Sequence, residues 1–198
     1  MKTRPAHQRP PYALLGLILL AAVALRVIGL RTAPPGPRFD EAYEALSARR
    51  VMNGERPIYF PENFGEEALN AYFHAASFAA LGWSDFALRF PSLCFGVIEV
   101  AALYALGTRV RNRRAGLIAA AVCAGSFWAI FFSRLGLRLI PLPALVSVAA
   151  LFIWQMQNGK GPSWARACAA GVLLGLAVHT YTAARALPIL IVGYLLYL

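Results

Sequence analysis

The chain has 198 residues, of which 59% are hydrophobic and 14% are charged, whereas soluble domains usually carry about 25% charged residues. Its net charge is +10, but the arginines lie in short groups between long apolar runs rather than on one basic face. This pattern argues against a soluble globular domain and against a nucleic-acid partner, and it predicts a protein embedded in a lipid bilayer.

The first apolar run, residues 12–30, is long enough for a membrane-spanning helix. Lys2, Arg4 and Arg9 precede this run and predict a cytoplasmic N-terminus. The run is longer than a typical signal-peptide core and no small-x-small cleavage site follows it, so we expect an uncleaved helix. Arg26 lies one turn from the outer end, where its side chain is expected to extend to the membrane interface.

A polar segment, residues 31–89, follows and contains eight of the nine acidic residues of the chain. The sequence Pro34-Pro35-Gly36-Pro37 cannot continue a helix. Residues 39–53 have acidic side chains at their start and arginines at their end, which suits the dipole of a helix. Residues 68–81 are apolar but too short to cross a bilayer, so we expect a helix lying at the membrane surface.

Five further apolar stretches predict membrane spans at about residues 90–108, 115–132, 139–156, 165–181 and 186–198. The N-terminus, the cluster from Arg109 to Arg114 and the segment from Lys160 to Arg166 are rich in basic residues. Placing all three in the cytoplasm satisfies the positive-inside rule. The loop at 31–89 then faces the extracytoplasmic side of the cell (plasma or inner) membrane, together with Arg134, Arg138 and Arg185.

The predicted fold class is therefore all-α, a polytopic membrane helix bundle whose extracytoplasmic first loop contains juxtamembrane helices. The last apolar run continues to Leu198 with no closing polar segment. We therefore expect residues 1–198 to form the N-terminal part of one membrane module, with the C-terminal part missing.

Two acidic pairs in the external loop are candidates for chemistry. Asp40-Glu41 and Glu66-Glu67 each stand at the start of an expected helix, where complementing the helix dipole is the simpler explanation. Carboxylates just outside a membrane also suit acid–base chemistry, and two such pairs can share a divalent metal. The sequence itself requires no cofactor.

Several cationic and polar residues on the same side can bind an anion. Arg134, Arg138 and Arg185 suit bidentate contact with a phosphate, although anchoring to lipid headgroups explains them equally well. His179 and Tyr181 form a polar group beside Arg185. Glu99 lies in the middle of a predicted span, where we expect a polar contact with another helix rather than a catalytic role.

The chain resembles bacterial membrane glycosyltransferases of the GT-C type, which include protein O-mannosyltransferases and lipid A aminoarabinose transferases (glycosyltransferase family 39-like). The resemblance covers about residues 12–198, and the Asp-Glu pair in the first loop is its most specific element. The matching segments are Pro34-Pro35-Gly36, Phe39-Asp40-Glu41-Ala42, Phe64-Gly65-Glu66, Ser133-Arg134-Leu135-Gly136-Leu137-Arg138 and Tyr181-Thr182-Ala183-Ala184-Arg185.

The resemblance implies transfer of a sugar from a polyprenyl-phosphate carrier to a hydroxyl of a protein, lipid or glycan acceptor, with inversion at the anomeric carbon. It assigns Asp40 as general base or orienting group, with Glu41 beside it in the catalytic pair. Arg134, Arg138, Arg185, Tyr181, His179 and Glu66 are the candidate substrate-binding residues. One departure concerns Glu67-Ala68, since relatives often carry Lys or Arg followed by Pro there.

Two other classes of function remain open. A membrane transporter would explain the helices and Glu99, but it would normally show internal repeats, and none is visible. A non-catalytic membrane component is the other alternative.

Overall fold

The computed structural model describes residues 12–62, 65–158 and 163–197. Within these ranges the regular secondary structure is helical apart from one short antiparallel pair, β1 (Tyr59–Phe60) and β2 (Glu66–Glu67). The expectation of a predominantly helical fold is thus confirmed. The N-terminal basic residues Lys2, Arg4 and Arg9, the motif residue Phe64, and Lys160 lie outside the described residues.

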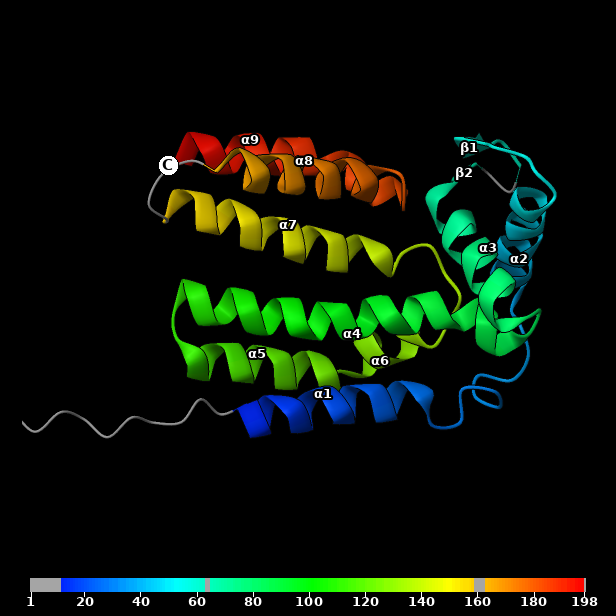
Figure 1. Cartoon of the computed structure of the whole chain (residues 1–198), viewed down its shortest axis with the longest axis horizontal. Coiled ribbons are helices and arrows are strands. Elements are labelled where there is room, and N and C mark those ends of the chain that lie inside the picture. The colour runs from blue at the N-terminus through cyan, green and yellow to red at the C-terminus, as the bar shows by residue number, and fades with distance from the viewer. Residues whose placement is uncertain (1–11, 63–64, 159–162, 198) are drawn as a thin grey trace, which may run out of the picture.

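Two parts make up the molecule, a bundle of long helices and a smaller outer module at one end (Figure 1). The outer module consists of α2, α3 and the β1–β2 pair. The turn between α4 and α5 and the ends of α7 and α9 lie at the opposite end. The long helices are α1 (Tyr12–Val27), α4 (Asp85–Val110), α5 (Arg113–Gly125), α6 (Phe127–Ser133), α7 (Pro141–Gln157), α8 (Trp164–Val178) and α9 (Leu187–Tyr197).

Each stretch that the sequence predicted as a span contains at least one of these helices. Only α4, at 26 residues, is by itself long and apolar enough to cross a bilayer among the described residues. The pair α5 and α6 passes the same test together, with a bend of 59° at the break between them. The helices α1, α7, α8 and α9 are apolar but shorter, at 16, 17, 15 and 11 residues.

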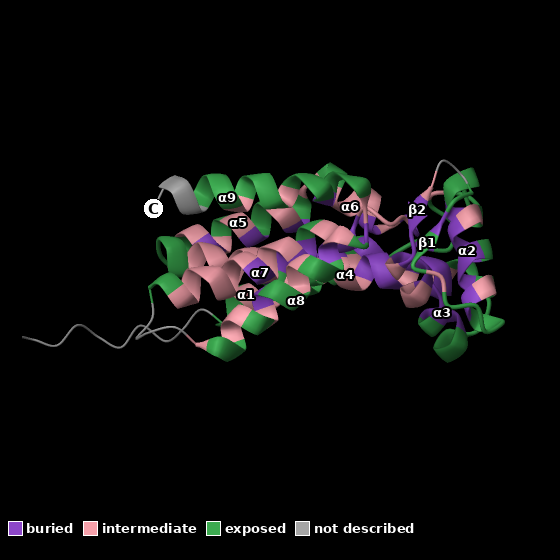
Figure 2. Ribbon diagram, turned by 90° about the horizontal axis from the view of Figure 1, so that it is seen from above, coloured by how far each residue is buried: buried purple, intermediate pink, exposed green. Residues whose placement is uncertain are grey.

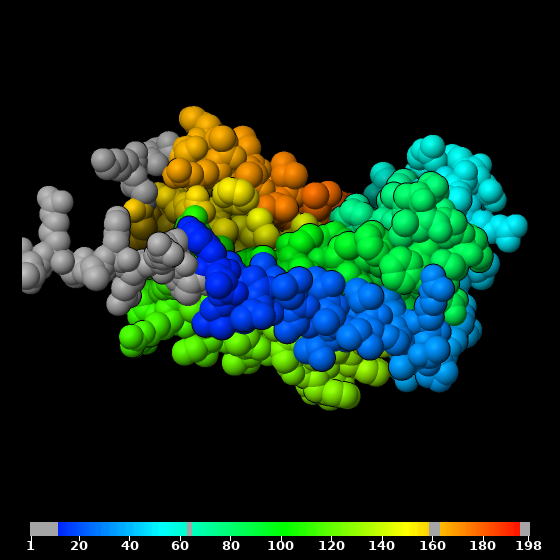
Figure 3. All heavy atoms as spheres, turned by 60° about the horizontal axis from the view of Figure 1, so that its bottom comes forward, coloured from blue at the N-terminus to red at the C-terminus, as the bar shows by residue number. Residues whose placement is uncertain are grey.

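Small side chains form the contacts between the long helices. Ala22 of α1, Val100 of α4 and Ala120 of α5 are fully buried in one cluster. Small residues allow helix backbones to approach closely, as they do in membrane bundles. Many larger apolar side chains are exposed instead, and the outer faces of these helices are mostly exposed or half-buried (Figure 2). Figure 3 shows α1 lying as a ridge along this surface.

Arg26 does not extend to an interface but is completely buried, so that expectation was wrong. Its guanidinium donates to the Ser133 hydroxyl and to the carbonyls of Ala22 and Ala124. The break between α5 and α6 explains the difference, because the last carbonyls of α5 have no partner within that helix. Gly96 leaves room for this contact, since a Cβ there would lie 3.0 Å from Nε of Arg26.

The expected polar contact of Glu99 is confirmed. The Ser147 hydroxyl on α7 donates to Glu99 Oε1 on α4 at 3.0 Å. The contact joins two neighbouring long helices.

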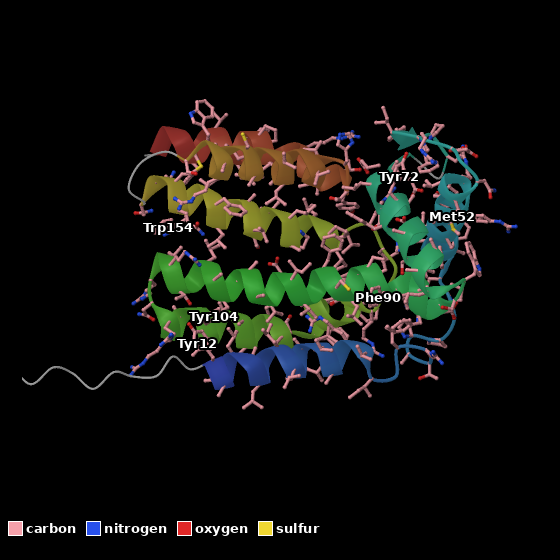
Figure 4. The ribbon with its side chains drawn as sticks, in the orientation of Figure 1. Tyr12, Met52, Tyr72, Phe90, Tyr104 and Trp154 are labelled. Carbon is pink, nitrogen blue, oxygen red and sulfur yellow. The ribbon has the colours of Figure 1, made fainter. Side chains whose placement is uncertain are left out.

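The two helices expected in the external loop are confirmed as α2 (Phe39–Met52) and α3 (Leu69–Leu81). Glu41 helps to begin α2, because its carboxylate accepts from the backbone amide of Arg38 at 3.1 Å. Both helices pack on the first turns of α4 around a core that includes Ala48, Phe60, Ala71 and Ala87. Figure 4 shows Tyr72 on α3. The hydroxyl of Tyr72 donates to the carbonyl of Pro57, and this hydrogen bond holds the segment before β1 against α3.

Candidate functional site

Asp40 and Glu41 share the first turn of α2 but face different surroundings. Consecutive helical residues point about 100° apart, so one of them faces inward while its neighbour faces outward. Asp40 is exposed, whereas the side chain of Glu41 is completely buried. The predicted acidic pair therefore consists of one carboxylate that a ligand can reach and one that is enclosed.

Glu41 forms an ion pair with Arg89 at the start of α4, and both side chains are fully buried. Nε of Arg89 lies 2.9 Å from Oε1, and a second guanidinium nitrogen lies 3.2 Å from Oε2. Burial alone would raise the pKa of Glu41, but the hydrogen bonds from Arg89 and from the amides of Gly136 and Arg38 outweigh it and lower the pKa. Glu41 is thus a fixed anion at the centre of the outer module.

Gly136 contributes to this centre through its backbone. Its amide donates to Glu41 Oε1 at 2.9 Å. A Cβ at this position would lie 3.0 Å from the carbonyl oxygen of Leu88 and 2.9 Å from its side chain. The close approach to α4 therefore suits a residue without a side chain.

Arg89 also fastens the segment that leads to Asp40. Its guanidinium donates to the carbonyls of Leu30 at 3.0 Å, Pro34 at 2.9 Å and Gly36 at 2.6 Å. One arginine thus holds both the loop before α2 and the first turn of α2. The position of Asp40 relative to the long helices follows from these contacts.

Arg134 lies beside the same loop and binds backbone. Its guanidinium donates to the carbonyls of Leu25, Arg26 and Ile28 at the end of α1, and to Ala33 at 2.8 Å. These are carbonyls that a helix end leaves without partners. The segment from Arg134 to Arg138 is not helical, so these two arginines do not share a helix face.

A second polar cluster, formed by Glu44, Asn70 and His74, lies between α2 and α3 and is buried. The Asn70 amide donates to Glu44 Oε2 at 2.9 Å and lies 2.8 Å from Nε2 of His74. Glu44 and His74 are themselves 4.0 Å apart, within the usual limit for an ion pair. Burial raises the pKa of Glu44 to about 8, with a further contribution from Glu66, and burial lowers the pKa of His74 to about 4. Both groups are therefore largely neutral at pH 7 and do not form a charged pair.

Glu66 connects α2 with Arg138. Its carboxylate accepts from the Ser47 hydroxyl at 2.8 Å and from Arg138 at 3.0 Å. Burial raises the pKa of Glu66, while the Ser47 hydrogen bond and Arg138 oppose the shift. The Arg138 side chain retains 22% of its exposure. This pair brings together two residues that the sequence predicted to bind substrate.

Glu67 connects β2 with the segment after α8. Arg185 and the Thr182 hydroxyl both approach Glu67 Oε1 at 3.3 Å. The Arg185 side chain is 63% exposed, so most of its surface remains open to a ligand. Tyr181 is half-buried and His179 is exposed, while the His179 carbonyl accepts from the amide of Leu69.

Arg89, Glu44 and Asn70 were not among the predicted site residues. The available signal for Glu44 was its spacing, since Glu41, Glu44 and Ser47 recur every three residues and so share a face of α2. Arg89 stood at the beginning of an apolar run with no pattern to distinguish it. Among the described residues, no group of three His, Cys, Asp or Glu side chains is placed to hold a metal ion.

Residues 68–198 match the sequence profile of the family described as dolichyl-phosphate-mannose-protein mannosyltransferase. No curated protein and no solved structure was found to match the chain. The matched region begins after α2, so it includes Arg89, Arg138 and Arg185 but not Asp40 or Glu41.

Proposed function

Because the chain belongs to the dolichyl-phosphate-mannose-protein mannosyltransferase family of GT-C membrane glycosyltransferases, we propose that it transfers a sugar from a polyprenyl-phosphate carrier to an acceptor hydroxyl. The acceptor is a protein, lipid or glycan. The reaction takes place at the end of the helices that carries α2 and α3, with Asp40 as general base.

The contrast between Asp40 and Glu41 is the observation that favours this assignment. A general base must come within hydrogen-bond reach of the hydroxyl that it deprotonates. Glu41 is enclosed and accepts hydrogen bonds from Arg89, Gly136 and Arg38. Asp40 is exposed on the adjoining position. Glu41 therefore acts as a positioning residue, and Asp40 is the carboxylate that meets the acceptor.

The chemical step is a direct displacement. Asp40 accepts the proton of the acceptor hydroxyl while the oxygen of that hydroxyl forms a bond to the anomeric carbon. The bond from that carbon to the carrier phosphate breaks, and the phosphate leaves with the electron pair, so the configuration inverts. Negative charge grows on the phosphate, and cations near it lower the barrier.

Arg138 and Arg185 are the cations that suit the leaving phosphate. Both side chains are partly exposed, and both are already placed beside carboxylates of β2. Arg134 suits this role less well, because its guanidinium is engaged by four backbone carbonyls. Tyr181, His179 and Glu66 adjoin this region and remain candidates for substrate contacts.

Two features support the proposed placement in the cell membrane. The helix α4 is long enough to cross it, at about 1.5 Å per residue over 26 residues. Large apolar side chains such as Leu20, Val122 and Ile189 are 68%, 66% and 75% exposed on the outer faces of α1, α5 and α9. Soluble monomers rarely expose extended apolar surfaces. The acidic outer module would then be extracytoplasmic and the basic end cytoplasmic.

The test is sugar transfer from radiolabelled polyprenyl-phosphate sugars in membranes that contain the full-length protein. We expect Asp40→Asn to abolish nearly all transfer at equal protein abundance. Asp85→Asn is the matched control, because Asp85 is also exposed in the first turn of a helix. Equal transfer by the wild type and Asp40→Asn would show that Asp40 only complements the helix dipole. Absence of transfer by the wild type to every acceptor would favour a transporter or a non-catalytic component.

A further inference from the structure

A cavity and an adjoining recess lie between helices of the bundle, apart from the Asp40 site. An apolar cavity of about 600 Å³ opens between α4, α7, α8 and α9. Its lining includes Leu106, Val146, Ile153, Trp154, Leu190 and Tyr194. Figure 4 shows Trp154 near the end of α7 that lies opposite the outer module.

A polar recess of about 330 Å³ adjoins this cavity and is lined by Arg109, Trp154, Gln155, Asn158 and Arg166. Trp154 lines both spaces, so the apolar cavity and the basic recess adjoin at this side chain. Within the part of the chain that the structure describes, neither Arg109 nor Arg166 takes part in an ion pair.

The positive charge of Arg109 and Arg166 is not balanced by acidic residues in the same half of the chain. Residues 100–198 contain no Asp or Glu at all. Two guanidinium groups in one recess therefore favour an anion from outside this half of the chain, and guanidinium groups bind phosphate oxygens in particular. An apolar cavity beside a basic recess is complementary to a lipid that has an apolar acyl chain and an anionic headgroup.

We propose that the two adjoining spaces hold one anionic phospholipid, with its phosphate between Arg109 and Arg166 and an acyl chain in the apolar cavity beside Trp154. The inference rests on the proposed membrane placement, and the exclusion of the donor lipid also rests on the proposed reaction at Asp40. The donor lipid does not fit the same site. Its phosphate must lie at the reacting carbon, whereas α7, with 17 residues, separates the two ends by about 25 Å.

Fluorescence of Trp154 provides a direct test. In the full-length protein, Trp83, Trp128 and Trp164 would be replaced by Phe, which leaves Trp154 as the reporter within residues 1–198. The protein would be placed in vesicles of phosphatidylcholine that contain a small fraction of brominated phosphatidylglycerol or, separately, brominated phosphatidylcholine. We expect the brominated phosphatidylglycerol to quench Trp154 at a much lower fraction of the bilayer.

The arginines account for this preference if the proposal is correct. A guanidinium in contact with the headgroup attracts its charge more strongly than a screened charge farther along the surface, so Arg109→Gln with Arg166→Gln should reduce the preference at least about tenfold. Arg111→Gln with Arg114→Gln is the matched control, because it removes the same charge at the same end from residues that do not line the recess. The control variant should keep the preference.

Three results would overturn the proposal. The first is equal quenching by the two brominated lipids, which would mean that Trp154 meets only bulk lipid. The second is an equal loss in the control variant, which would assign the preference to general surface charge. The third is no quenching by either lipid, which would mean that protein covers the cavity.

Native mass spectrometry of phosphatidylglycerol retained by the protein with its tryptophans intact repeats the test without the tryptophan substitutions. Sugar transfer measured on the same samples separates failure of the lipid site from failure of the proposed reaction.

Discussion

Arg89 and Glu41 are 48 residues apart in the chain, yet they form a fully buried ion pair that joins the start of α4 to the first turn of α2. The same guanidinium holds three carbonyls of the loop between α1 and α2. The pair therefore determines where Asp40 lies, although neither partner is exposed to a ligand.

Removing one partner of this pair should be strongly destabilising. Glu41→Gln leaves the charge of Arg89 buried without compensation, at a cost of about 3–5 kcal/mol in the free energy of unfolding. Thermal unfolding in detergent measures the effect. A double variant, Glu41→Gln with Arg89→Met, should lose less free energy of unfolding than the two single variants lose in sum, because it removes the uncompensated charge. Additive losses would contradict the pairing.

Asp40 should behave in the opposite way. Its side chain is exposed, and exposed substitutions usually change stability by less than about 0.5 kcal/mol. Asp40→Asn should therefore unfold at nearly the wild-type temperature while it loses transfer. A large drop in unfolding temperature for this variant would mean that lost activity reports lost structure, and the assignment of Asp40 as base would then have no support.

Helix positions could be predicted well from the sequence, because the length of an apolar run and the charges at helix ends are local properties of the chain. The acidic first turn predicted the start of α2, and the length of the apolar run predicted that α3 would be short. The surroundings of each charge could not be predicted in the same way. Arg26 was expected at an interface and is buried, since the break after α5 supplies a carbonyl that only the folded bundle places nearby.

The site shows the same limit. The Asp-Glu motif drew attention to the correct turn, but helix geometry alone does not say which carboxylate faces inward. That choice depends on Arg89, whose partners lie between residues 30 and 41, which is 48 to 59 residues earlier in the chain. Long-range pairs of this kind leave no periodic signal in one sequence. The three predicted arginines likewise have different partners, which only the tertiary structure reveals.

The cluster of Glu44 and His74 should give stability a distinct pH dependence. The pKa of Glu44 is raised to about 8, so its contribution to stability is present below its unfolded pKa and is lost as the pH rises toward 8. The pKa of His74 is lowered to about 4, so its contribution is present above its unfolded pKa and is lost as the pH falls toward 4. The two slopes oppose each other between about pH 4.5 and 6.5, and Glu44 alone remains above that range.

Glu44→Gln removes the contribution of Glu44 to the pH dependence of stability, because an amide keeps an acceptor for Asn70 but does not titrate. The variant should raise the unfolding temperature relative to the wild type at pH 8 and change it little at pH 5. Thermal unfolding at the two pH values, in one detergent, checks the result. Identical pH profiles for the two proteins would show that Glu44 has an ordinary pKa.

Substitutions of Arg185 and Arg134 should have different effects, one on donor binding and the other on stability. Arg185 is mostly exposed, and exposed ion pairs contribute about 0–1 kcal/mol, so Arg185→Gln should hardly affect unfolding. Loss of a charged hydrogen bond to the donor phosphate, about 1.5–3 kcal/mol, should raise the KM for the donor at least tenfold. Arg134→Gln should instead lower the unfolding temperature, since it leaves carbonyls of α1 without partners. A donor KM unchanged in Arg185→Gln would remove this residue from the site.

Gly96 offers a test of packing inside the bundle. A Cβ at this position would lie 2.6 Å from Ser133 Cβ and 2.7 Å from its hydroxyl, where Arg26 also donates. Gly96→Ala should therefore destabilise the protein by about 1–3 kcal/mol, as overpacking usually does. Gly171→Ala on α8 is the matched control, because nothing lies within 4 Å of its added Cβ. An alanine in the middle of a helix is favoured over glycine by about 0.5–1 kcal/mol, so this control should be slightly more stable than the wild type. If both variants unfolded at the same temperature, α4 would not approach Ser133 and Arg26 as closely as the structure describes.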